Sequence, residues 1–286
     1  MSTTRPVLTA IRAGLTAGRI ELRQTFTNGQ DLWNYLFPPV IMILVMFFMR
    51  NSEVQNTGFS LATMTLPSTL GMGIAFTGLM STAAILVIDR EDGTLLRAKA
   101  IPHGMIGYLV RKIVLVTGMS LVSFLLLLLA GSSLFDGLQL SDPHVWLTLA
   151  WLIPIGLLAT MPIGAVLGSI ISNARNMGVI MVPNMALIGI SGIFYPITEY
   201  PGWLQGIAQV FPIYWLGLGM RSAMLPDAMV TVEIADSWRH WETFGVLAAW
   251  AVVGLIVAPI VLRRMARRES GSSVAARREK ALQRTF

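Results

Sequence analysis

Cysteine is absent from all 286 residues, which excludes a disulfide framework, a thiolate metal site and a cysteine nucleophile. Charge is scarce as well: 13% of the residues are Asp, Glu, Lys or Arg, against about 25% in an ordinary soluble domain. The sequence contains no G-x-x-x-x-G-K-[ST] phosphate loop, so we expect no nucleotide hydrolysis by that route in this chain. Hydrophobic residues make up 54% of the sequence instead, and their runs indicate a membrane protein.

Six uncharged stretches are each long enough to cross a bilayer, which takes about 20 apolar residues. They are Leu32–Met49, the middle of Val54–Ile88, Ile113–Phe135, Val145–Ala174, Asn176–Thr198 and Thr243–Leu262. None carries a charged side chain near its middle, which argues against a proton relay inside the membrane. We therefore predict an all-α, polytopic membrane protein with six transmembrane helices in residues 32–262, an N-terminal arm at 1–31 and a basic tail at 263–286.

The basic residues alternate from side to side across the six predicted helices. The arm, Asp89–Lys112, Ser172–Asn176 and the tail carry four, five, one and eight Lys or Arg residues, which is 18 of the 21 in the chain. Because basic segments stay in the cytoplasm, we predict both termini there. A seventh helix at Tyr200–Met220 would expel the tail, so this stretch is predicted to be an external re-entrant element before the last helix. The candidate gate residues are Pro201, Trp203 and Phe211 in this stretch and Phe194 shortly before it.

The arm has apolar residues at helical spacing and arginines every seven residues, at Arg5, Arg12 and Arg19. This pattern predicts an amphipathic helix. Two interpretations stay open: a helix that lies on an anionic membrane surface, and an ordinary basic face in contact with solvent. For the basic tail we expect contact with anionic membrane lipids. We expect no nucleic-acid binding, since no aromatic or fold signal accompanies the charge.

A compact charged loop, Asp89–Lys112, separates the second and third predicted helices. Glu91 and Asp92 precede a short helical run, Leu95–Ala100, and acids favour the positive end of a helix. Pro102 ends the run. Because a helix of about two turns is not stable alone in water, it must dock against something. We interpret the loop as the handle by which another protein moves the membrane domain.

The same loop approaches the metal motif of the alcohol phosphotransferases that make phospholipids, D-x-x-D-G-x-x-A-R followed by two further Asp. Asp89, Asp92 and Gly93 match, but Leu96 replaces the Ala and no acid occurs in 93–135. Two divalent ions need more oxygen ligands than this loop offers. Two alternative functions stay open for this membrane protein. The first is a stand-alone secondary drug transporter, and the second, which fits less well, is a membrane phosphotransferase.

The loop also fits a second pattern, E-x-G-T-L-x-x-L-x-x-x-P, at Glu91, Gly93, Thr94, Leu95 and Pro102. This pattern resembles the signature of ABC-2 type permeases, the membrane halves of a class of ATP-driven exporters. Ala98 stands where the family has its second Leu. The stretch from Phe194 to Arg221 resembles the family's external re-entrant stretch. The resemblance covers nearly the whole chain, and the sequence looks most like the daunorubicin-resistance type found with drug and lipid exporters.

The resemblance implies a machine of several chains. Two permease chains, as a homodimer or a related heterodimer, would pair around a central path in the bacterial inner (plasma) membrane. Two copies of a cytoplasmic ABC ATPase subunit would bind below them and hold ATP and Mg, so this chain would need no cofactor or metal and have no catalytic residue. The residues implied to couple the permease to the ATPase are Glu91, Gly93, Thr94, Leu95, Leu96, Arg97, Lys99 and Pro102.

The resemblance also implies that the second and fifth membrane helices line the path. Candidate cargo-path residues on these helices are Phe76, Thr77, Met80, Asn184, Ile188, Ser191 and Tyr195. Apolar faces with a few polar groups suit an amphipathic drug or lipid-like cargo. The competing interpretation is that such residues serve helix packing and interhelical hydrogen bonds.

Overall fold

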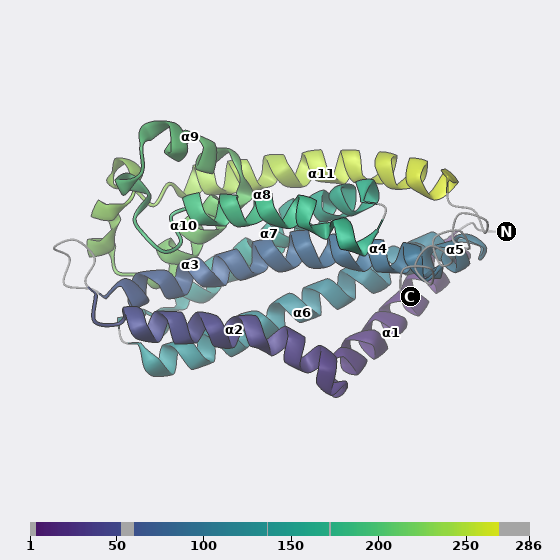
Figure 1. The fold of residues 1–286 in the computed structure, drawn as a ribbon, viewed down its shortest axis with the longest axis horizontal. Coiled ribbons are helices and arrows are strands. Elements are labelled where there is room, and N and C mark those ends of the chain that lie inside the picture. The colour runs from purple at the N-terminus through teal and green to yellow at the C-terminus, as the bar shows by residue number, and fades with distance from the viewer. Residues whose placement is uncertain (1–3, 53–59, 136, 172, 269–286) are drawn as a thin grey trace.

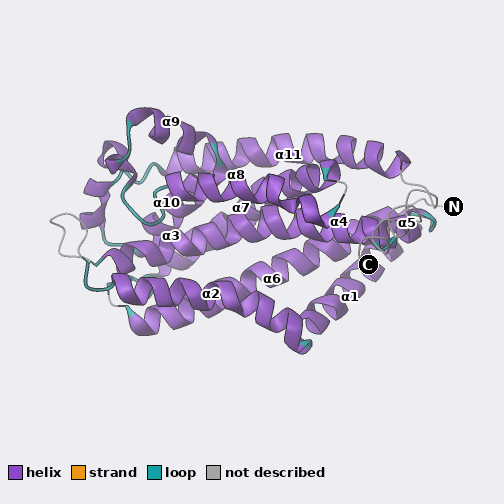
Figure 2. Cartoon of the chain, in the orientation of Figure 1, coloured by secondary structure: helices purple, strands orange, loops and turns teal. Residues whose placement is uncertain are grey.

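The structure is a computed structural model that describes residues 4–52, 60–135, 137–171 and 173–268 (Figure 1). Within these ranges every regular element is a helix and no strand occurs (Figure 2), which confirms the predicted all-α class. The elements are, in order, α1 (Thr4–Thr27), α2 (Gly29–Met49), α3 (Leu61–Phe76), the π-helix η1 (Thr77–Ser81), α4 (Thr82–Glu91), α5 (Thr94–Lys99), α6 (Gly104–Leu134), α7 (Pro143–Ile170), η2 (Ala174–Met177), α8 (Gly178–Ile190), η3 (Ile197–Glu199), α9 (Gly202–Val210), α10 (Pro212–Met224), η4 (Asp227–Val232), η5 (Ile234–Asp236) and α11 (His240–Arg268).

Four helices in the described part of the chain are long and apolar enough to cross a membrane. They are the continuous rod α3–η1–α4 (Leu61–Glu91), α6, α7 and α11. The fifth predicted helix is shorter in the structure, where the apolar helix is Ala174–Ile190, whereas α2 contains all of the first predicted helix, Leu32–Met49. The 13 residues of α8 rise only about 20 Å, less than the roughly 30 Å of a hydrocarbon core. The count of six membrane helices therefore stays a prediction.

The long helices run side by side along one axis of the molecule (Figure 1). At one end, which we call the coupling end, α5 packs against α4, α6 and the last turns of α11. At the opposite end, which we call the cap end, α9 and α10 close over the bundle. The predicted handle and the predicted re-entrant element therefore lie at opposite ends of the same bundle.

The predicted re-entrant element, Tyr200–Met220, is two helices that break between Phe211 and Pro212. The break has a local cause, since proline is favoured in the first turn of a helix and the residue before it is pushed out of helical geometry. All but one of the residues of α10 are buried, and the helix packs closely on α3: a side chain added at Gly71 would meet the backbone of Leu216 at 2.5 Å. The α10 part of this uncharged stretch therefore belongs to the protein core, whereas in α9 only Ala208 is buried, and the stretch does not form a seventh long helix.

The arm forms α1 as predicted, and the structure packs it against α6. The contact depends on two glycines that let the backbones approach. A Cβ at Gly14 would lie 2.5 Å from the carbonyl oxygen of Gly107, and one at Gly18 would lie 2.8 Å from that of Arg111. Arg12 is on the exposed side, so contact of this side with a membrane stays a prediction.

At the other terminus the predicted tail begins inside α11, and residues 269–286 lie outside the described residues.

Candidate functional site

The loop between the second and third predicted helices contains α5, one residue earlier at each end than predicted. Gly93 permits this start because its φ of 79° is in the left-handed region, where a side chain is unfavourable. The backbone N–H of Thr94 donates to the Asp92 carboxylate at 2.8 Å, so Asp92 supplies the acid at the start of α5. Glu91 instead ends α4, and its carboxylate accepts a hydrogen bond from the N–H of Ala174 at 2.9 Å. The expectation that Glu91 sits at the start of the short helix is thus corrected.

One side of α5 is fixed to the rest of the chain. Leu95 is 2% exposed and packs with Leu86 of α4, Tyr108 of α6 and Met265 of α11. Leu95 is among the residues implied to couple the chain to the ATPase, and its burial leaves it little surface for direct contact with a second protein. Leu95 is instead the anchor through which α5 holds three long helices together at the coupling end.

The other side of α5 faces outward. Arg97 and Pro102, both predicted to contact a partner, are exposed. Lys99 is exposed as well, although its ammonium donates to the carbonyl oxygen of Ala266 at 2.8 Å, at the negative end of α11. Sequence reasoning missed Ile101, which is 61% exposed. An isolated apolar residue beside Pro102 is the signal that could have indicated it.

An open groove of about 630 Å³ runs between α1, α5 and α6 at the coupling end. Arg97, Ile101 and His103 line one wall, and small residues of α1, among them Ala10 and Gly14, line the other. The groove is wide enough to take side chains of a second protein, since ligand pockets span about 300–1,000 Å³.

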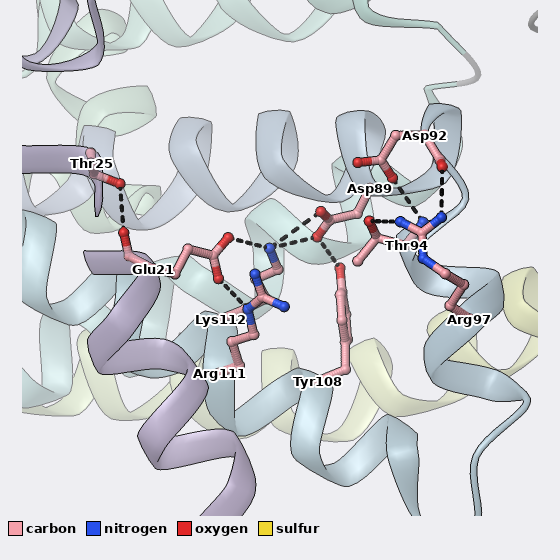
Figure 3. A network of polar contacts seen from close by, with 9 residues as sticks. All are labelled: Glu21, Thr25, Asp89, Asp92, Thr94, Arg97, Tyr108, Arg111 and Lys112. Carbon is pink, nitrogen blue, oxygen red and sulfur yellow. Dashed lines mark hydrogen bonds and ion pairs between the residues drawn. The ribbon is translucent and has the colours of Figure 1, made fainter. Parts of the chain in front are cut away.

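A chain of alternating charges lies next to this groove and joins three helices (Figure 3). The carboxylate of Glu21 on α1 pairs with Arg111 and, at 2.9 Å, with Lys112, both on α6. The ammonium of Lys112 also lies 2.9 Å from the carboxylate of Asp89 on α4. The hydroxyl of Tyr108 donates to the same carboxylate at 2.8 Å. The side chains of Asp89 and Lys112 are only about one-tenth exposed, so this contact is screened little by solvent.

The sequence analysis identified Asp89–Lys112 as a unit but did not identify Glu21 as its partner. The available signal was that Glu21 is the single acid within α1. A second unrecognised contact lies beside it: the guanidinium of Arg90 donates to the carbonyl oxygens of Ser169 and Ile171 at 3.0 and 2.8 Å. This contact fixes α4 to the end of α7, so the coupling end is connected to that helix as well.

The cap end contains a buried ion pair. Arg221 of α10 is 1% exposed, and its Nε and Nη2 atoms donate to the two carboxylate oxygens of Glu233 at 2.5 and 3.1 Å. Its Nη1 atom donates to the Ser68 hydroxyl at 2.8 Å and to the carbonyl oxygen of Gly192 at 3.2 Å. Burial raises the pKa of the nearby Tyr214 to about 12, so its hydroxyl stays protonated at neutral pH. The Arg221 side chain thus connects α10 to α3, to the turn after α8 and to the segment after η4.

The predicted gate residues have different environments. The ring of Phe211 stacks on that of Trp250 in α11, with centroids 6.2 Å apart, and the Trp250 indole donates to the carbonyl oxygen of Val210 at 2.7 Å. Trp203 is 67% exposed, so it does not pack into this chain. Phe194 is half-buried, and Pro201 is the exposed residue before α9. Of the four, Phe211 is therefore the one that ties the cap to a long helix.

The cargo-path candidates on the second helix do not share one environment. Phe76 and Thr77 line a cavity between α2, the rod and α6. Met80 is instead buried against Ile180 of α8. The interpretation that Met80 serves helix packing fits this position better.

The candidates on the fifth helix are similarly divided. Asn184, 3% exposed, lines a second, apolar groove of about 400 Å³ between α7, α8 and α11. Ile188 and Ser191 are buried in the core, and the Ser191 hydroxyl donates to the carbonyl oxygen of Leu187. Tyr195 is 55% exposed. Within one chain, then, three of the seven candidates line a hollow, Phe76 and Thr77 in one and Asn184 in another.

Comparison with known proteins gives the family. A family model described as ABC-2 family transporter protein matches residues 19–260. The comparison with curated proteins gives no significant match. The match extends from the second half of α1 into α11 and includes α5, the charge network and the cap end. Because it spans most of the chain, this protein belongs to the ABC-2 family and is the membrane component of a transporter.

Proposed function

We propose that this chain is the permease subunit of an ATP-binding cassette exporter, and that a separate cytoplasmic ATPase moves it by pushing on α5. The observation that carries the proposal is the two-sided environment of α5. Arg97 is exposed on one side, while Leu95 is buried against α4, α6 and α11 on the other. A displacement of the exposed side would therefore reach three membrane helices at once. We place the motor on another chain, and this sequence contains no phosphate loop.

The proposed complex contains two permease chains and two ATPase subunits, which carry the ATP and Mg. The outward side of α8 supports a second permease chain, since Val179 and Val182 are 71% and 70% exposed and a helix this short needs protein neighbours in a membrane. The second chain is a copy of this one or a related protein. In the complex α2 and α8 act as the first and fifth of six membrane helices.

The proposed setting is the bacterial inner membrane, with both termini in the cytoplasm. The coupling end carries the basic loop, the arginines of α1 and those at the end of α11, and basic segments are retained on the cytoplasmic side. The cap end then lies outside the cell. This orientation presents α5 to a soluble ATPase.

The proposed cargo is an amphipathic drug or lipid-like molecule, as expected for the daunorubicin-resistance type of exporter. The lining of both membrane-level hollows supports this class, because it is mostly aliphatic with a few hydroxyl or amide groups such as Thr77 and Asn184. A strongly charged cargo would have no counter-charge there among the lining residues.

The test is reconstitution of the chain in vesicles together with an ABC ATPase subunit. We expect ATP-driven efflux of a fluorescent amphiphile such as daunorubicin, and its loss in Gly93→Val, because a β-branched residue strongly disfavours φ of 79°. Gly245→Val is the control, since a Cβ added there meets nothing within 4 Å. Efflux driven by a proton gradient without the ATPase would contradict the proposal and favour a stand-alone secondary transporter.

A further inference from the structure

One of the hollows lies entirely within a single chain, between α2, the rod α3–η1–α4 and α6, which are neighbours in the bundle (Figure 1). Its volume is about 210 Å³. That exceeds the roughly 150 Å³ of an engineered protein cavity that binds benzene, and it is below the roughly 300 Å³ at which pockets for drug-sized ligands begin. The cavity therefore suits a narrow ligand about as wide as one alkyl chain.

Most of the cavity wall is apolar, formed by residues such as Met42, Ile74 and Leu127. Two of its walls, the rod and α6, are helices long and apolar enough to cross a membrane. Pro38 of α2 is exposed where it borders the cavity. A molecule that reaches this site thus comes from the hydrocarbon layer of the bilayer.

Five hydroxyl groups interrupt this apolar wall. They belong to Thr69, Thr77, Ser81, Ser120 and Ser123. Thr69 and Ser120 are 1% and 2% exposed, and neither hydroxyl has a hydrogen-bond partner in the described part of the chain.

An unpaired buried hydroxyl is unfavourable. Some hydroxyls of the bundle avoid it, although those of Thr65 and Thr82 on the rod do not. Ser68 donates to the carbonyl oxygen of Met64, and Thr160 to that of Gly156, which is the usual solution for such residues in membrane helices. Thr69 and Ser120 differ from these in lining a cavity. Both hydroxyl oxygens have almost no accessible surface in this structure, so a side-chain rotation brings either hydroxyl to a ligand group that donates and accepts hydrogen bonds.

We infer that this cavity binds a single-chain amphiphile dissolved in the membrane, with its alkyl chain along the apolar wall and its hydroxyl group bonded to Thr69 or Ser120. The site is complete within one chain and is separate from any path between two permeases. It does not depend on the proposed exporter function, because it needs neither an ATPase nor transport.

Gly73 provides a way to fill the cavity without disturbing the fold. It lines the cavity, and a Cβ added there meets no atom within 4 Å. Gly73→Leu therefore places a branched side chain in the space assigned to the ligand. Gly245→Leu on α11 is the matched control, since it adds the same side chain to another open position of a long helix.

The experiment uses the purified full chain in detergent micelles and two photoreactive probes, hexadecanol and hexadecane that carry the same diazirine. Labelled peptides are identified by mass spectrometry. We expect hexadecanol to label α3–η1 and the middle of α6 about fivefold more than hexadecane, the ratio given by one hydrogen bond of about 1 kcal/mol. Gly73→Leu should abolish labelling of these segments by both probes, whereas Gly245→Leu should leave it unchanged.

The double variant Thr69→Val, Ser120→Ala removes both hydroxyl groups and keeps the cavity, so it tests the hydrogen bond separately from the space. We expect it to keep the labelling by hexadecane and to lose the fivefold preference for hexadecanol. Equal labelling by the two probes in the native chain would overturn the inference, since the cavity would then hold hydrocarbon only. Labelling that survives Gly73→Leu would overturn it too, because the probes would then bind elsewhere on these helices.

Discussion

Two buried charges decide the stability of the cap end. Arg221 and Glu233 are 1% and 3% exposed and share two hydrogen bonds. Removal of one partner of such a pair leaves the other charge buried and unpaired, which costs about 3–5 kcal/mol. We expect Arg221→Met to lower the free energy of unfolding in detergent by roughly that amount, as measured by denaturant titration.

Glu242→Gln is the control for this prediction. Glu242 pairs with Arg239 at 3.6 Å but its side chain is 52% exposed, and pairs of this kind contribute about 0–1 kcal/mol. A loss in Arg221→Met no larger than in the control would show that the buried pair does not hold the cap.

At the coupling end, Lys112→Met and Asp89→Asn should reduce the stability of the protein by different amounts. Lys112 lies between the carboxylates of Glu21 and Asp89 at 2.9 Å from each. Lys112→Met would leave the buried Asp89 without a cation, whereas Glu21 keeps Arg111, so we expect a loss of about 3–5 kcal/mol. Asp89→Asn leaves Lys112 paired with Glu21, and the loss should be about 1–3 kcal/mol. Thermal unfolding of the purified variants gives the order, and a reversed order would mean that Lys112 is not the centre of the network.

At the scale of elements, the α1–α6 contact depends on the absence of side chains. Because a Cβ at Gly14 would lie 2.5 Å from the carbonyl oxygen of Gly107, Gly14→Ala must push the helices apart at a cost of about 1–3 kcal/mol. We expect faster amide hydrogen exchange throughout α1. Gly29→Ala, where an added Cβ meets nothing within 4 Å, should leave exchange in α1 as it is in the native chain.

The sequence predicted α5 to within one residue because its limits are local. Gly93 supplies the left-handed turn at its start, and Pro102 follows its end. The orientation of the helix could not be predicted, since the burial of Leu95 depends on Met265, which is 170 residues away. The same holds for Glu21 and Lys112, whose pairing is set by how α1 packs on α6.

The cap end shows a different limit of sequence reasoning. Prolines mark the starts of both helices there, since α9 follows Pro201 directly and α10 begins at Pro212. A helix that is hydrophobic all round is buried either in lipid or in protein, so the pattern of α10 alone could not choose between them. The charge balance excluded a seventh membrane helix, but the four hydrogen bonds of Arg221 to Glu233, Ser68 and Gly192 join residues too far apart in sequence to be read from it.

At the scale of the whole molecule, the proposed orientation can be tested with single cysteines, because the chain has none of its own. A membrane-impermeant thiol reagent applied to intact cells should label Ser141→Cys and Ser237→Cys at the cap end, both of which are exposed positions. It should not label Ser272→Cys in the basic tail until the cells are opened. Labelling of the tail from outside would contradict the six-helix arrangement.

The central claim is that a separate ATPase moves this chain through α5, and site-specific crosslinking tests it most directly. A photoreactive amino acid at Arg97 or Ile101, both exposed at the coupling end, should crosslink to the ATPase subunit in native membranes. The same residue at Ser141, at the cap end, should not. If neither Arg97 nor Ile101 gives a crosslink while the complex still hydrolyses ATP, then α5 is only a connector and the account is contradicted.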